Sequence, residues 1–309
     1  MKKSVQPKQN SSAQPRRRRW VRILASIWRG WRSFWRWYFS LYRGRSWWFR
    51  LWVIFLSVIG FTFLYAVALT LNLFWLFGKS PSPFEIMNPR NPEASELYYS
   101  DGTLIGKLYD ENRTSVPMDS IAPVFFKALV DTEDERFYSH HGIDFHGLAA
   151  AGKDAIMGHP RGASTITQQL VKNMFRIRTQ YSTGLLGYIP GVSILIKKSK
   201  EMLIAVELEL LNDKDEILTM YANTVDFGSN AYGIKTAART YFNKEPRDLK
   251  TEEAAVLVGL LKATSTYNPR INPEASLRRR NVVLENMYEH QHLSRAECDS
   301  LQALPIELH

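Results

Sequence analysis

The chain has 309 residues, of which 40 are Lys or Arg and 30 are Asp or Glu, so its formal net charge is +10. The first 50 residues hold 14 of the basic residues and no acidic one, whereas residues 51–309 carry a net charge of −4. This split argues against a catalytic domain that wraps nucleic acid, because such a domain carries its positive charge in the folded part. A hydrophobic content of 45% excludes wholesale disorder, and the single cysteine, Cys298, excludes an internal disulfide framework and a cysteine-based zinc site.

Residues 1–50 combine basic and aromatic side chains. We expect residues 1–19 to form a disordered basic tail in the cytoplasm. Residues 20–50 predict a basic amphipathic helix at the membrane surface, because at about 100° per residue the arginines fall on one side and most aromatic and aliphatic residues on the other. Gly30 and Gly44 are candidate interruptions of this helix. An irregular basic tail that only sets membrane topology is the alternative.

Residues 51–78 contain no charged side chain. A helix of this length is roughly 42 Å long, more than the ~30 Å hydrocarbon core of a bilayer requires. We therefore predict a single transmembrane helix over 51–78, with a buried core helix as the alternative. Fourteen Lys or Arg precede it and only Lys79, Arg90 and Lys107 follow within 30 residues. The positive-inside rule then predicts a cytoplasmic N-terminus and an outer domain.

Residues 79–309 predict one mainly α-helical domain. Prolines mark residues 79–94 as a linker, and alternating apolar residues on both sides of Asp101-Gly102 predict a hairpin over 96–109. Residues 291–309 form a C-terminal segment. Apolar residues at helical spacing predict helices over 121–137, 164–177, 194–211, 213–222, 231–241, 251–262 and 274–290.

Four polar clusters interrupt these apolar patterns, and the first spans residues 133–144. It places the carboxylates of Glu133 and Asp134 next to aromatic residues, where loss of water can make a carboxylate a useful base. A solvated helix end is the plainer interpretation. The histidines at 140, 141 and 146 do not match the spacing of a metal site.

The second cluster spans residues 162–173. Ser164 is the expected N-cap of a helix, and Thr165, Gln168, Gln169 and Lys172 follow on one face. A helix start with free N–H groups, a hydroxyl and a lysine can hold a phosphate or pyrophosphate. An ordinary capped helix with a polar face explains the pattern equally well.

The third and fourth clusters are less specific by themselves. Lys197 and Lys198 lie one turn before Glu201, so both can neighbour its carboxylate, although a surface ion pair is the plainer interpretation. The fourth cluster comprises residues 221–223 and 228–233 and then 261–269, which read alone as turns between helices.

The order of the clusters and the residues at fixed positions within them are more informative than any single cluster. The pattern reads Glu133-Asp134-x-x-Phe137-x-x-His140-x-Gly142, then Gly162-x-Ser164-Thr165-Ile166-Thr167-Gln168-Gln169-Leu170-x-Lys172-Asn173, Lys198-x-x-Glu201 and Tyr221-x-Asn223. Over residues 95–290 it resembles the family 51 glycosyltransferases. These are the peptidoglycan-polymerising domains of class A penicillin-binding proteins and of monofunctional transglycosylases. The resemblance implies a mainly α-helical, lysozyme-like domain with a small membrane-proximal lobe.

The resemblance also implies an activity. The domain would polymerise lipid II into β-1,4-linked glycan strands with inversion, releasing undecaprenyl pyrophosphate. Glu133 would be the catalytic base, and Glu201 would orient the pyrophosphate site or assist. By similarity, the substrate- and pyrophosphate-binding positions are Asp134, Phe137, His140, Ser164, Thr165, Gln168, Gln169, Lys172, Asn173, Lys197, Lys198, Asn223, Lys262 and Ser265.

Elementary chemistry agrees with a transferase. A glycosidase needs an acid to protonate its leaving group, whereas pyrophosphate leaves without a proton but needs cations to meet its charge. One carboxylate with several lysines therefore suits transfer from a pyrophosphate better than hydrolysis. Two alternatives remain open: a lytic enzyme on a related fold, and a non-catalytic anchor that recruits cell-wall proteins.

The resemblance implies partners and a location. The partners would be lipid II, the growing glycan strand, membrane lipids and other cell-wall synthesis proteins, with no nucleic acid. The enzyme would be a single-pass protein of the inner membrane, with its catalytic domain on the periplasmic or outer face. A divalent cation, Mg or Mn, at the pyrophosphate is compatible with this assignment, but the sequence holds no dedicated carboxylate cage and no metal ligand is assigned.

The sequence departs from the family pattern in three places. Lys197 stands where the family usually has arginine, so a bidentate fork is lost. Residues 179–196 hold an insertion whose apolar part, 184–192, is expected to dip into the outer leaflet, with a buried core loop as the alternative. No Ser-x-x-Lys nucleophile of a transpeptidase occurs. The chain is therefore expected to be monofunctional or the front of a bifunctional protein, and residues 261–269 favour the second.

Overall fold

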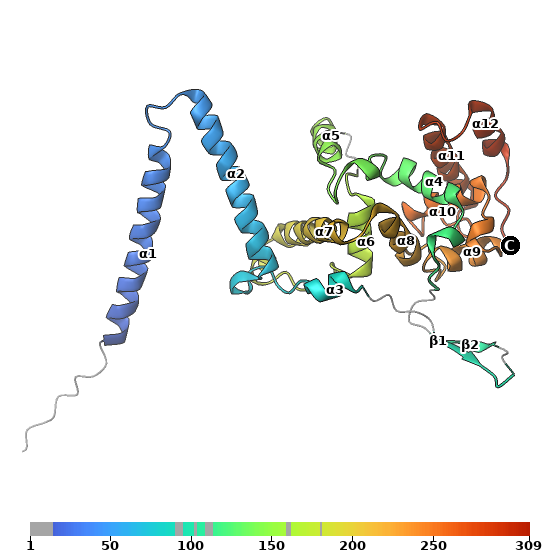
Figure 1. The fold of residues 1–309 in the computed structure, drawn as a ribbon, viewed down its shortest axis with the longest axis horizontal. Helices are drawn as coiled ribbons and strands as arrows, with labels where there is room; N and C mark the ends of the chain where they lie inside the picture. The colour runs from blue at the N-terminus through green and yellow to red at the C-terminus, as the bar shows by residue number, and fades with distance from the viewer. Residues whose placement is uncertain (1–14, 90–94, 102–103, 109–113, 159–161, 180) are drawn as a thin grey trace, which may run out of the picture. The chain divides into compact units, whose positions relative to one another are not determined.

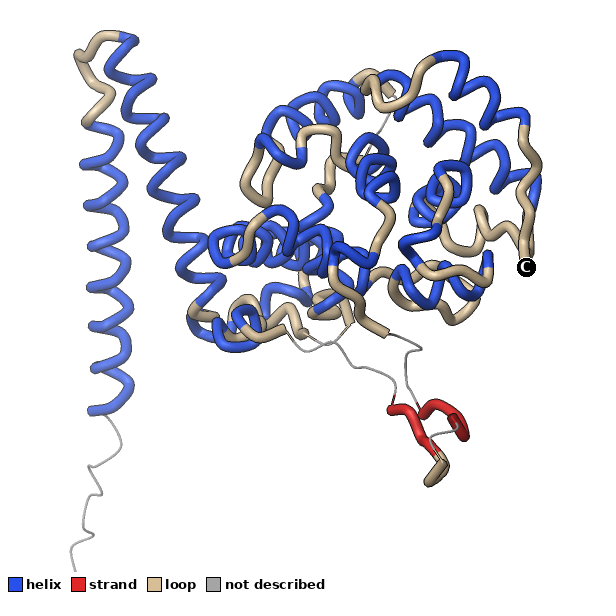
Figure 2. Tube along the Cα trace, turned by 45° about the vertical axis from the view of Figure 1, so that its right-hand side comes forward, coloured by secondary structure: helices blue, strands red, loops and turns tan. Residues whose placement is uncertain are grey.

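The computed structural model describes residues 15–89, 95–101, 104–108, 114–158, 162–179 and 181–309. The chain divides into two compact units, residues 1–67 and residues 68–309 (Figure 1). Helices dominate both units (Figure 2). The predicted fold class, mainly α with one apolar N-terminal helix, is confirmed.

The first unit contains α1, Pro15–Ser40, and most of α2, Trp47–Thr70. Residues 15–19, which were expected in the disordered tail, belong to α1, since Pro at the first helical position is compatible with a helix. Gly30 does not interrupt α1. Gly44, with φ +71°, lies in the turn that separates the two helices. The expected tail residues 1–14 lie outside the described residues.

α2 is, within the described residues, the single helix long and apolar enough to cross a membrane, with a mean hydropathy of 2.3. Its 24 residues correspond to roughly 36 Å. The helix begins before the expected start at 51 and ends before 78. Asn72, with φ +46°, ends the regular backbone, and a short 3₁₀ turn, Leu73–Trp75, follows. Residues 71–79, which follow α2, are called the connector.

The predicted hairpin is present in the second unit. β1, Ser95–Tyr98, pairs antiparallel with β2, Leu104–Leu108, so that Ser95 faces Leu108 and Tyr98 faces Leu104. A register irregularity lies between Leu97 and Tyr98. A five-residue helix, α3, Pro83–Met87, precedes the hairpin and begins with a Ser82–Glu85 capping box.

All seven helices predicted by spacing occur, with ends shifted by a few residues. Three further helices, the short α3 and the longer α5 and α12, were not predicted. α12 begins with a capping box of Ser294 and Glu297, a signal that is visible in the sequence, whereas Asp144 at the start of α5 makes no side-chain cap. The helices are α4 Pro123–Glu133, α5 Phe145–Ile156, α6 Ile166–Met174, α7 Val192–Leu211, α8 Lys214–Thr224, α9 Ile234–Phe242, α10 Thr251–Leu261, α11 Pro273–Glu289 and α12 Arg295–Ala303.

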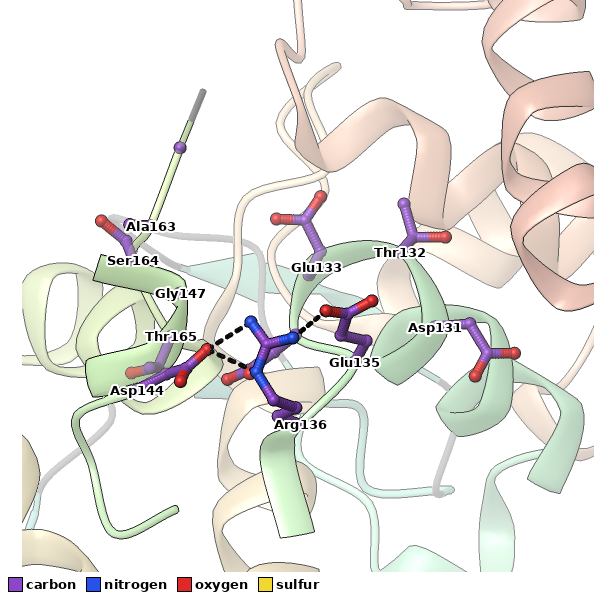
Figure 3. A pocket seen from close by; sticks show the side chains of 12 residues that line it. Asp131, Thr132, Glu133, Glu135, Arg136, Asp144, Gly147, Ala163, Ser164 and Thr165 are labelled. Atoms are coloured by element: carbon purple, nitrogen blue, oxygen red, sulfur yellow. Dashed lines mark hydrogen bonds and ion pairs between the residues drawn. The ribbon is translucent and has the colours of Figure 1, made fainter. Parts of the chain in front are cut away.

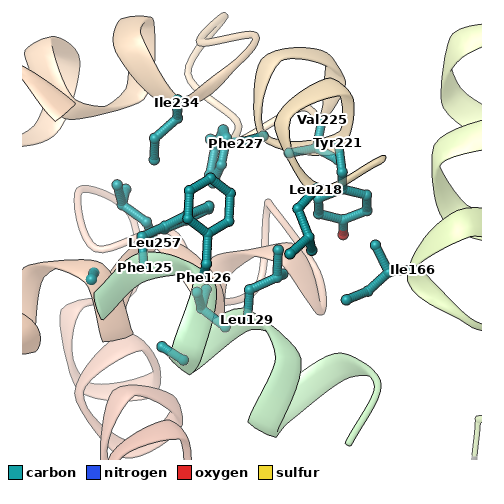
Figure 4. Close-up of a cluster of buried hydrophobic side chains, with 14 of the residues drawn as sticks. Phe125, Phe126, Leu129, Ile166, Leu218, Tyr221, Val225, Phe227, Ile234 and Leu257 are labelled. Carbon is teal, nitrogen blue, oxygen red and sulfur yellow. The ribbon is translucent and has the colours of Figure 1, made fainter. Parts of the chain in front are cut away.

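α10 forms the centre of the core. Its residues 254–260 are all buried, as expected of a helix that is apolar on every side, and it packs against α4 and α11. α6 packs against α7 and α8. Figure 4 shows Phe125 and Leu129 of α4 pointing toward Leu257 of α10 and Leu218 of α8. The core thereby fixes the C-terminal end of α4 close to α6 and α8.

The insertion fits neither expectation completely. Residues 185–188 form a 3₁₀ turn, and α7 begins at Val192. Leu186 packs against a small apolar cluster of Leu69, Phe77 and Ile196. Leu185, Tyr188 and Ile189, in contrast, are exposed. One side of the loop therefore packs against the apolar cluster through Leu186, and the other side exposes apolar side chains at its surface.

Candidate active site

Glu133 is the last residue of α4, and its carboxylate meets groups from two other helices. Gln169 Nε2 of α6 donates to Glu133 Oε2 over 2.9 Å. Arg279 Nη2 of α11 lies 3.9 Å from Glu133 Oε1, and the Glu133 side chain is 13% exposed. Glu133 is thus a largely buried carboxylate with one amide donor and one facing cation.

Tyr221 of α8 sets the orientation of Gln169. Its hydroxyl donates to Gln169 Oε1 over 3.0 Å, which leaves the amide NH₂ group to face Glu133. Burial, with a further contribution from the negative charge of Glu133, raises the pKa of Tyr221 well above its ordinary value. Tyr221 therefore remains a hydrogen-bond donor, and the three side chains form a chain that ends at the carboxylate.

A pocket of about 210 Å³ opens beside Glu133. Residues 131–136 line one side and residues 162–165 another, with Asp144 between them. Figure 3 shows the Arg136 guanidinium between the carboxylates of Glu135 and Asp144; its Nε and Nη2 lie 3.0 and 2.7 Å from Asp144 Oδ2. The hydrogen bonds from Arg136 hold the pKa of Asp144 below its ordinary value. The pocket is lined largely by polar and charged side chains.

Asp134, Phe137 and His140 follow Glu133 in the chain and are buried next to the site. Both Asp134 oxygens lie 3.0 Å from His140 Nε2, and Asp134 Oδ2 also accepts from the backbone N–H of Ile166 over 2.9 Å. Phe137 is fully buried, and Lys214 Nζ lies 4.2 Å from its ring centre. These three residues were expected to bind substrate. Through these contacts Asp134 ties the end of α4 to the start of α6, and substrate binding by the three residues stays a prediction.

The start of α6 differs by one residue from the expectation. Thr165, not Ser164, is the N-cap: its hydroxyl accepts from Gln168 N over 3.2 Å and donates to the Gly142 carbonyl over 2.9 Å. Gln168 Nε2 also donates to that carbonyl, over 3.0 Å. Ser164 is thereby left exposed, and its hydroxyl accepts from Lys198 Nζ over 2.9 Å.

A group of cations surrounds Glu201 of α7. Lys198 Nζ lies 3.4 Å from Glu201 Oε2, and Arg178 donates through Nε to Oε1 over 2.8 Å and through Nη2 to Oε2 over 3.5 Å. Burial lowers the pKa of Lys198, Glu201 opposes this, and the nearby charges of Arg178 and Lys172 lower it further. We call Arg178, Lys198 and Lys172 the cationic cluster.

Lys197 does not join Glu201, contrary to the expectation. Its Nζ donates to the Arg178 carbonyl over 3.1 Å. Arg178 supplies the forked guanidinium that Lys197 lacks, and sequence analysis missed it because it lies 23 positions before Glu201. Lys172 and Asn173 are part-buried and make no side-chain hydrogen bond among the described residues. The charge of Lys172 nevertheless acts on Lys198, whose pKa it lowers.

Two neighbouring glutamines connect the carboxylate and the cations. Gln169 bonds Glu133, while Gln168 Oε1 accepts from Lys198 Nζ over 2.7 Å. Both glutamines lie in the first turn of α6, so the spacing between Glu133 and Lys198 is set by one rigid element. A largely buried carboxylate and an ammonium group are thus held at a fixed separation.

Three expected positions are not brought into this arrangement. Asn223 is buried and pairs with the backbone of Val116, accepting over 3.0 Å and donating over 2.8 Å. Lys262 and Ser265 are exposed beyond the end of α10, and neither side chain bonds a member of the site in the described part of the chain. Asn223 was predicted from its motif, but its neighbour Tyr221 is the residue of that motif that reaches Glu133 through Gln169.

The described residues do not form a metal site by themselves. No group of three or more His, Cys, Asp or Glu side chains among them could hold a metal ion. Within the described part of the chain, Glu201 is the carboxylate that contacts the cationic cluster, and it is already paired with Arg178 and Lys198. This donor set does not match the oxygen cage of a resident divalent cation.

Comparison with known proteins assigns the chain to a sequence family. Residues 101–288 match the family model described as transglycosylase. Penicillin-binding protein 1A of Escherichia coli is 39% identical over 213 residues, which cover 68% of this chain and 24% of that protein. Penicillin-binding protein 1F of Bacillus subtilis is 37% identical over 218 residues, covering 70% and 29%. The chain thus spans about a quarter of the length of these relatives.

Solved structures are also similar to this chain. The crystal structure of penicillin-binding protein 1A from Haemophilus influenzae aligns with a TM-score of 0.40 and 24% sequence identity. The alignment covers 71% of this chain and 21% of that one.

Proposed function

Because the chain belongs to the transglycosylase family, we propose that it is a peptidoglycan glycosyltransferase of bacterial cell-wall synthesis. Its substrate is lipid II, which it polymerises into β-1,4-linked glycan strands with release of undecaprenyl pyrophosphate. The observation that carries the proposal is the pair Gln168 and Gln169 in the first turn of α6. Gln168 bonds Lys198, and Gln169 bonds Glu133. A base and a pyrophosphate site at a fixed distance are what this transfer requires.

Glu133 is the general base of the proposed reaction. It takes the proton from the 4-hydroxyl of the acceptor sugar, and that oxygen forms a bond to C1 of the donor. The bond between C1 and the pyrophosphate oxygen breaks with its electron pair, and the configuration at C1 inverts. Gln169 and Arg279 hold the two carboxylate oxygens in place while the proton is transferred.

The cationic cluster receives the leaving group. Lys198, Lys172 and Arg178 present positive charge to the pyrophosphate, so no acid is needed to protonate it. Glu201 orients Lys198 and Arg178. A divalent cation, Mg or Mn, would have to find its ligands on the pyrophosphate oxygens, and no step of the proposal depends on it.

The proposed location is the inner membrane, with α2 as a single span. Thirteen basic residues precede α2 and Arg50 lies in its first turn, which favours a cytoplasmic N-terminus and a domain on the periplasmic or outer face. That placement gives the domain access to a substrate that stays anchored in lipid. Membrane lipids and other cell-wall synthesis proteins are its proposed partners.

The test is polymerisation of lipid II by the purified full chain, with Glu133→Gln as the variant. Loss of the base should lower the rate by roughly 10²- to 10⁴-fold, while the amide keeps the size of the side chain. The control is Glu289→Gln, which changes an exposed glutamate at the end of α11. A Glu133→Gln variant that polymerises as fast as wild type would refute the assignment, and shortening of purified glycan strands would indicate a lytic enzyme instead.

A further inference from the structure

Lys200 is a buried lysine that has no carboxylate partner among the described residues. It lies on α7 and is 1% exposed. Its ammonium donates to three backbone carbonyls: Lys79 O over 2.7 Å, Ser182 O over 3.1 Å and Gly78 O over 3.2 Å. Burial lowers its pKa to about 8, so the position carries a desolvation cost that no ion pair offsets. The interactions that stabilise the buried ammonium are therefore its hydrogen bonds to the three carbonyls.

The carbonyls belong to two segments that are far apart in the sequence. Gly78 and Lys79 end the connector, and Ser182 lies in the loop that begins the insertion. The two segments are so close that a Cβ on Gly78, whose φ is +72°, would lie 2.2 Å from Ser182 O. The backbone N–H of Leu186 also donates to the Leu76 carbonyl over 3.0 Å. Lys200 joins the connector, the loop and α7 at one point.

The loop held by Lys200 carries part of the site. Arg178, which forks onto Glu201, lies four residues before Ser182 in the same irregular stretch. α7 itself carries Lys198 and Glu201. Lys198 and Lys200 are two positions apart, roughly 200° around a helix, and therefore point to nearly opposite faces. One face of α7 holds the cationic cluster, and the other face holds the connector and the loop.

We propose that Lys200 is a positioning residue for the pyrophosphate site: it fastens the connector and the Arg178 loop to α7, and so fixes Arg178 relative to Lys198. This inference rests on the proposed function and adds to it the connector as part of the active-site scaffold. A small apolar cluster supports the same contact: Leu69 at the end of α2 and Phe77 of the connector pack against Ile196 of α7. Lys200 supplies the directional part of that contact, since hydrogen bonds specify geometry and apolar contacts do not.

The test uses Lys200→Met in the full chain, in detergent or nanodiscs. Met keeps the length of the side chain and removes all three donors. We expect faster amide hydrogen exchange in residues 184–189, where the Leu186 amide bonds to Leu76, and a rise in KM for lipid II together with a fall in kcat. A misplacement of the cationic cluster by about 1 Å should lower kcat/KM by roughly 10- to 100-fold. Partial loss of folded enzyme would lower kcat and leave KM unchanged.

Two further variants keep the test decisive if Lys200→Met folds poorly. Gly78→Ala disturbs the same contact from the connector side without changing α7, and should raise KM in the same way. Gly152→Ala is its control, because a Cβ there meets nothing within 4 Å. Lys127→Met, at an exposed lysine of α4, is the control for Lys200→Met.

The outcomes separate this inference from the proposed function. Unchanged exchange in residues 184–189, or faster exchange with kcat/KM within twofold of wild type, overturns the role of Lys200. A wild-type chain that does not polymerise lipid II refutes the proposed function instead. In that case the exchange data and the affinity for inorganic pyrophosphate still decide whether Lys200 positions the cluster: unchanged affinity in Lys200→Met overturns it.

Discussion

Replacing Arg178 with Met should destabilise the second unit, residues 68–309, by about 1 to 2 kcal/mol and impair catalysis as well. Glu201 is 2% exposed at its side chain, whereas Arg178 is 57% exposed. Removing one partner of a fully buried ion pair costs about 3 to 5 kcal/mol, and an exposed pair contributes about 0 to 1 kcal/mol. The half-exposed guanidinium lies between these limits. Lys198 remains 3.4 Å from the carboxylate and limits the loss.

The assay is a double-mutant cycle with Arg178→Met and Glu201→Gln, read by thermal unfolding of the full chain in detergent. A loss of 1 to 2 kcal/mol corresponds to a fall in melting temperature of about 2 to 8 °C for a domain of this size. The coupling energy between the two substitutions should be about 1 to 2 kcal/mol. Lipid II polymerisation by Arg178→Met should fall by roughly 10- to 100-fold, because one donor to the leaving group is lost.

An exposed ion pair on α11 provides the matched control. Arg278 and Glu274 lie 3.7 Å apart and are 73% and 91% exposed at their side chains. The same cycle on this pair should give a coupling energy of about 0 to 0.5 kcal/mol. A coupling energy between Arg178 and Glu201 no larger than that of the control would refute the reasoning, since the burial of Glu201 would then have no energetic effect.

Three other predictions follow from single contacts. Tyr221→Phe removes the donor that orients Gln169, so the polymerisation rate should fall by about threefold to tenfold, the equivalent of one hydrogen bond. Thr165→Ala removes the N-cap of α6 and should lower the free energy of unfolding by about 1 to 2 kcal/mol, while Thr165→Ser keeps the cap and most of the stability. Lys200 has a pKa of about 8 in the folded protein, below its ordinary value of 10.5, so the unfolded chain binds the proton more tightly. The free energy of unfolding of wild type relative to Lys200→Met should therefore rise between pH 8 and 10.5, by up to about 3 kcal/mol.

Each of these predictions has an outcome that contradicts it. A Tyr221→Phe variant with the wild-type rate would show that Gln169 is held without the hydroxyl. Equal melting temperatures for Thr165→Ala and Thr165→Ser would exclude the cap as the source of stability. A difference between wild type and Lys200→Met that does not change with pH would mean that the ammonium is solvated in the folded protein.

Much of the fold could be predicted from the sequence because its causes are local. Helical spacing of apolar residues reports which face of a segment is buried, and the predicted helices occur near the expected positions. A long uncharged stretch marks a candidate membrane helix, although its end at Thr70 depends on the backbone of Asn72. α5 was missed because its start lacks a side-chain cap and its sequence holds two glycines.

Contacts within the site could be predicted from the sequence only where both residues lie on the same helix. Lys198 and Glu201 are one helical turn apart, so their proximity follows from spacing. Arg178 approaches Glu201 from a loop, and no periodicity relates the two. Asn223 and Tyr221 share one motif, yet Tyr221 reaches the site and Asn223 pairs with the backbone of Val116.

What the sequence by itself determined is therefore the set of chemical groups and the elements that carry them: a carboxylate at a helix end, a polar turn of a second helix, and lysines before Glu201. What only the tertiary structure decided is which of these groups meet. Packing of α4, α6, α7 and α8 brings Glu133 to Gln169 and Lys200 to the connector. Such contacts join residues 36 to 121 positions apart, and they depend on how the helices pack rather than on any pattern along the chain.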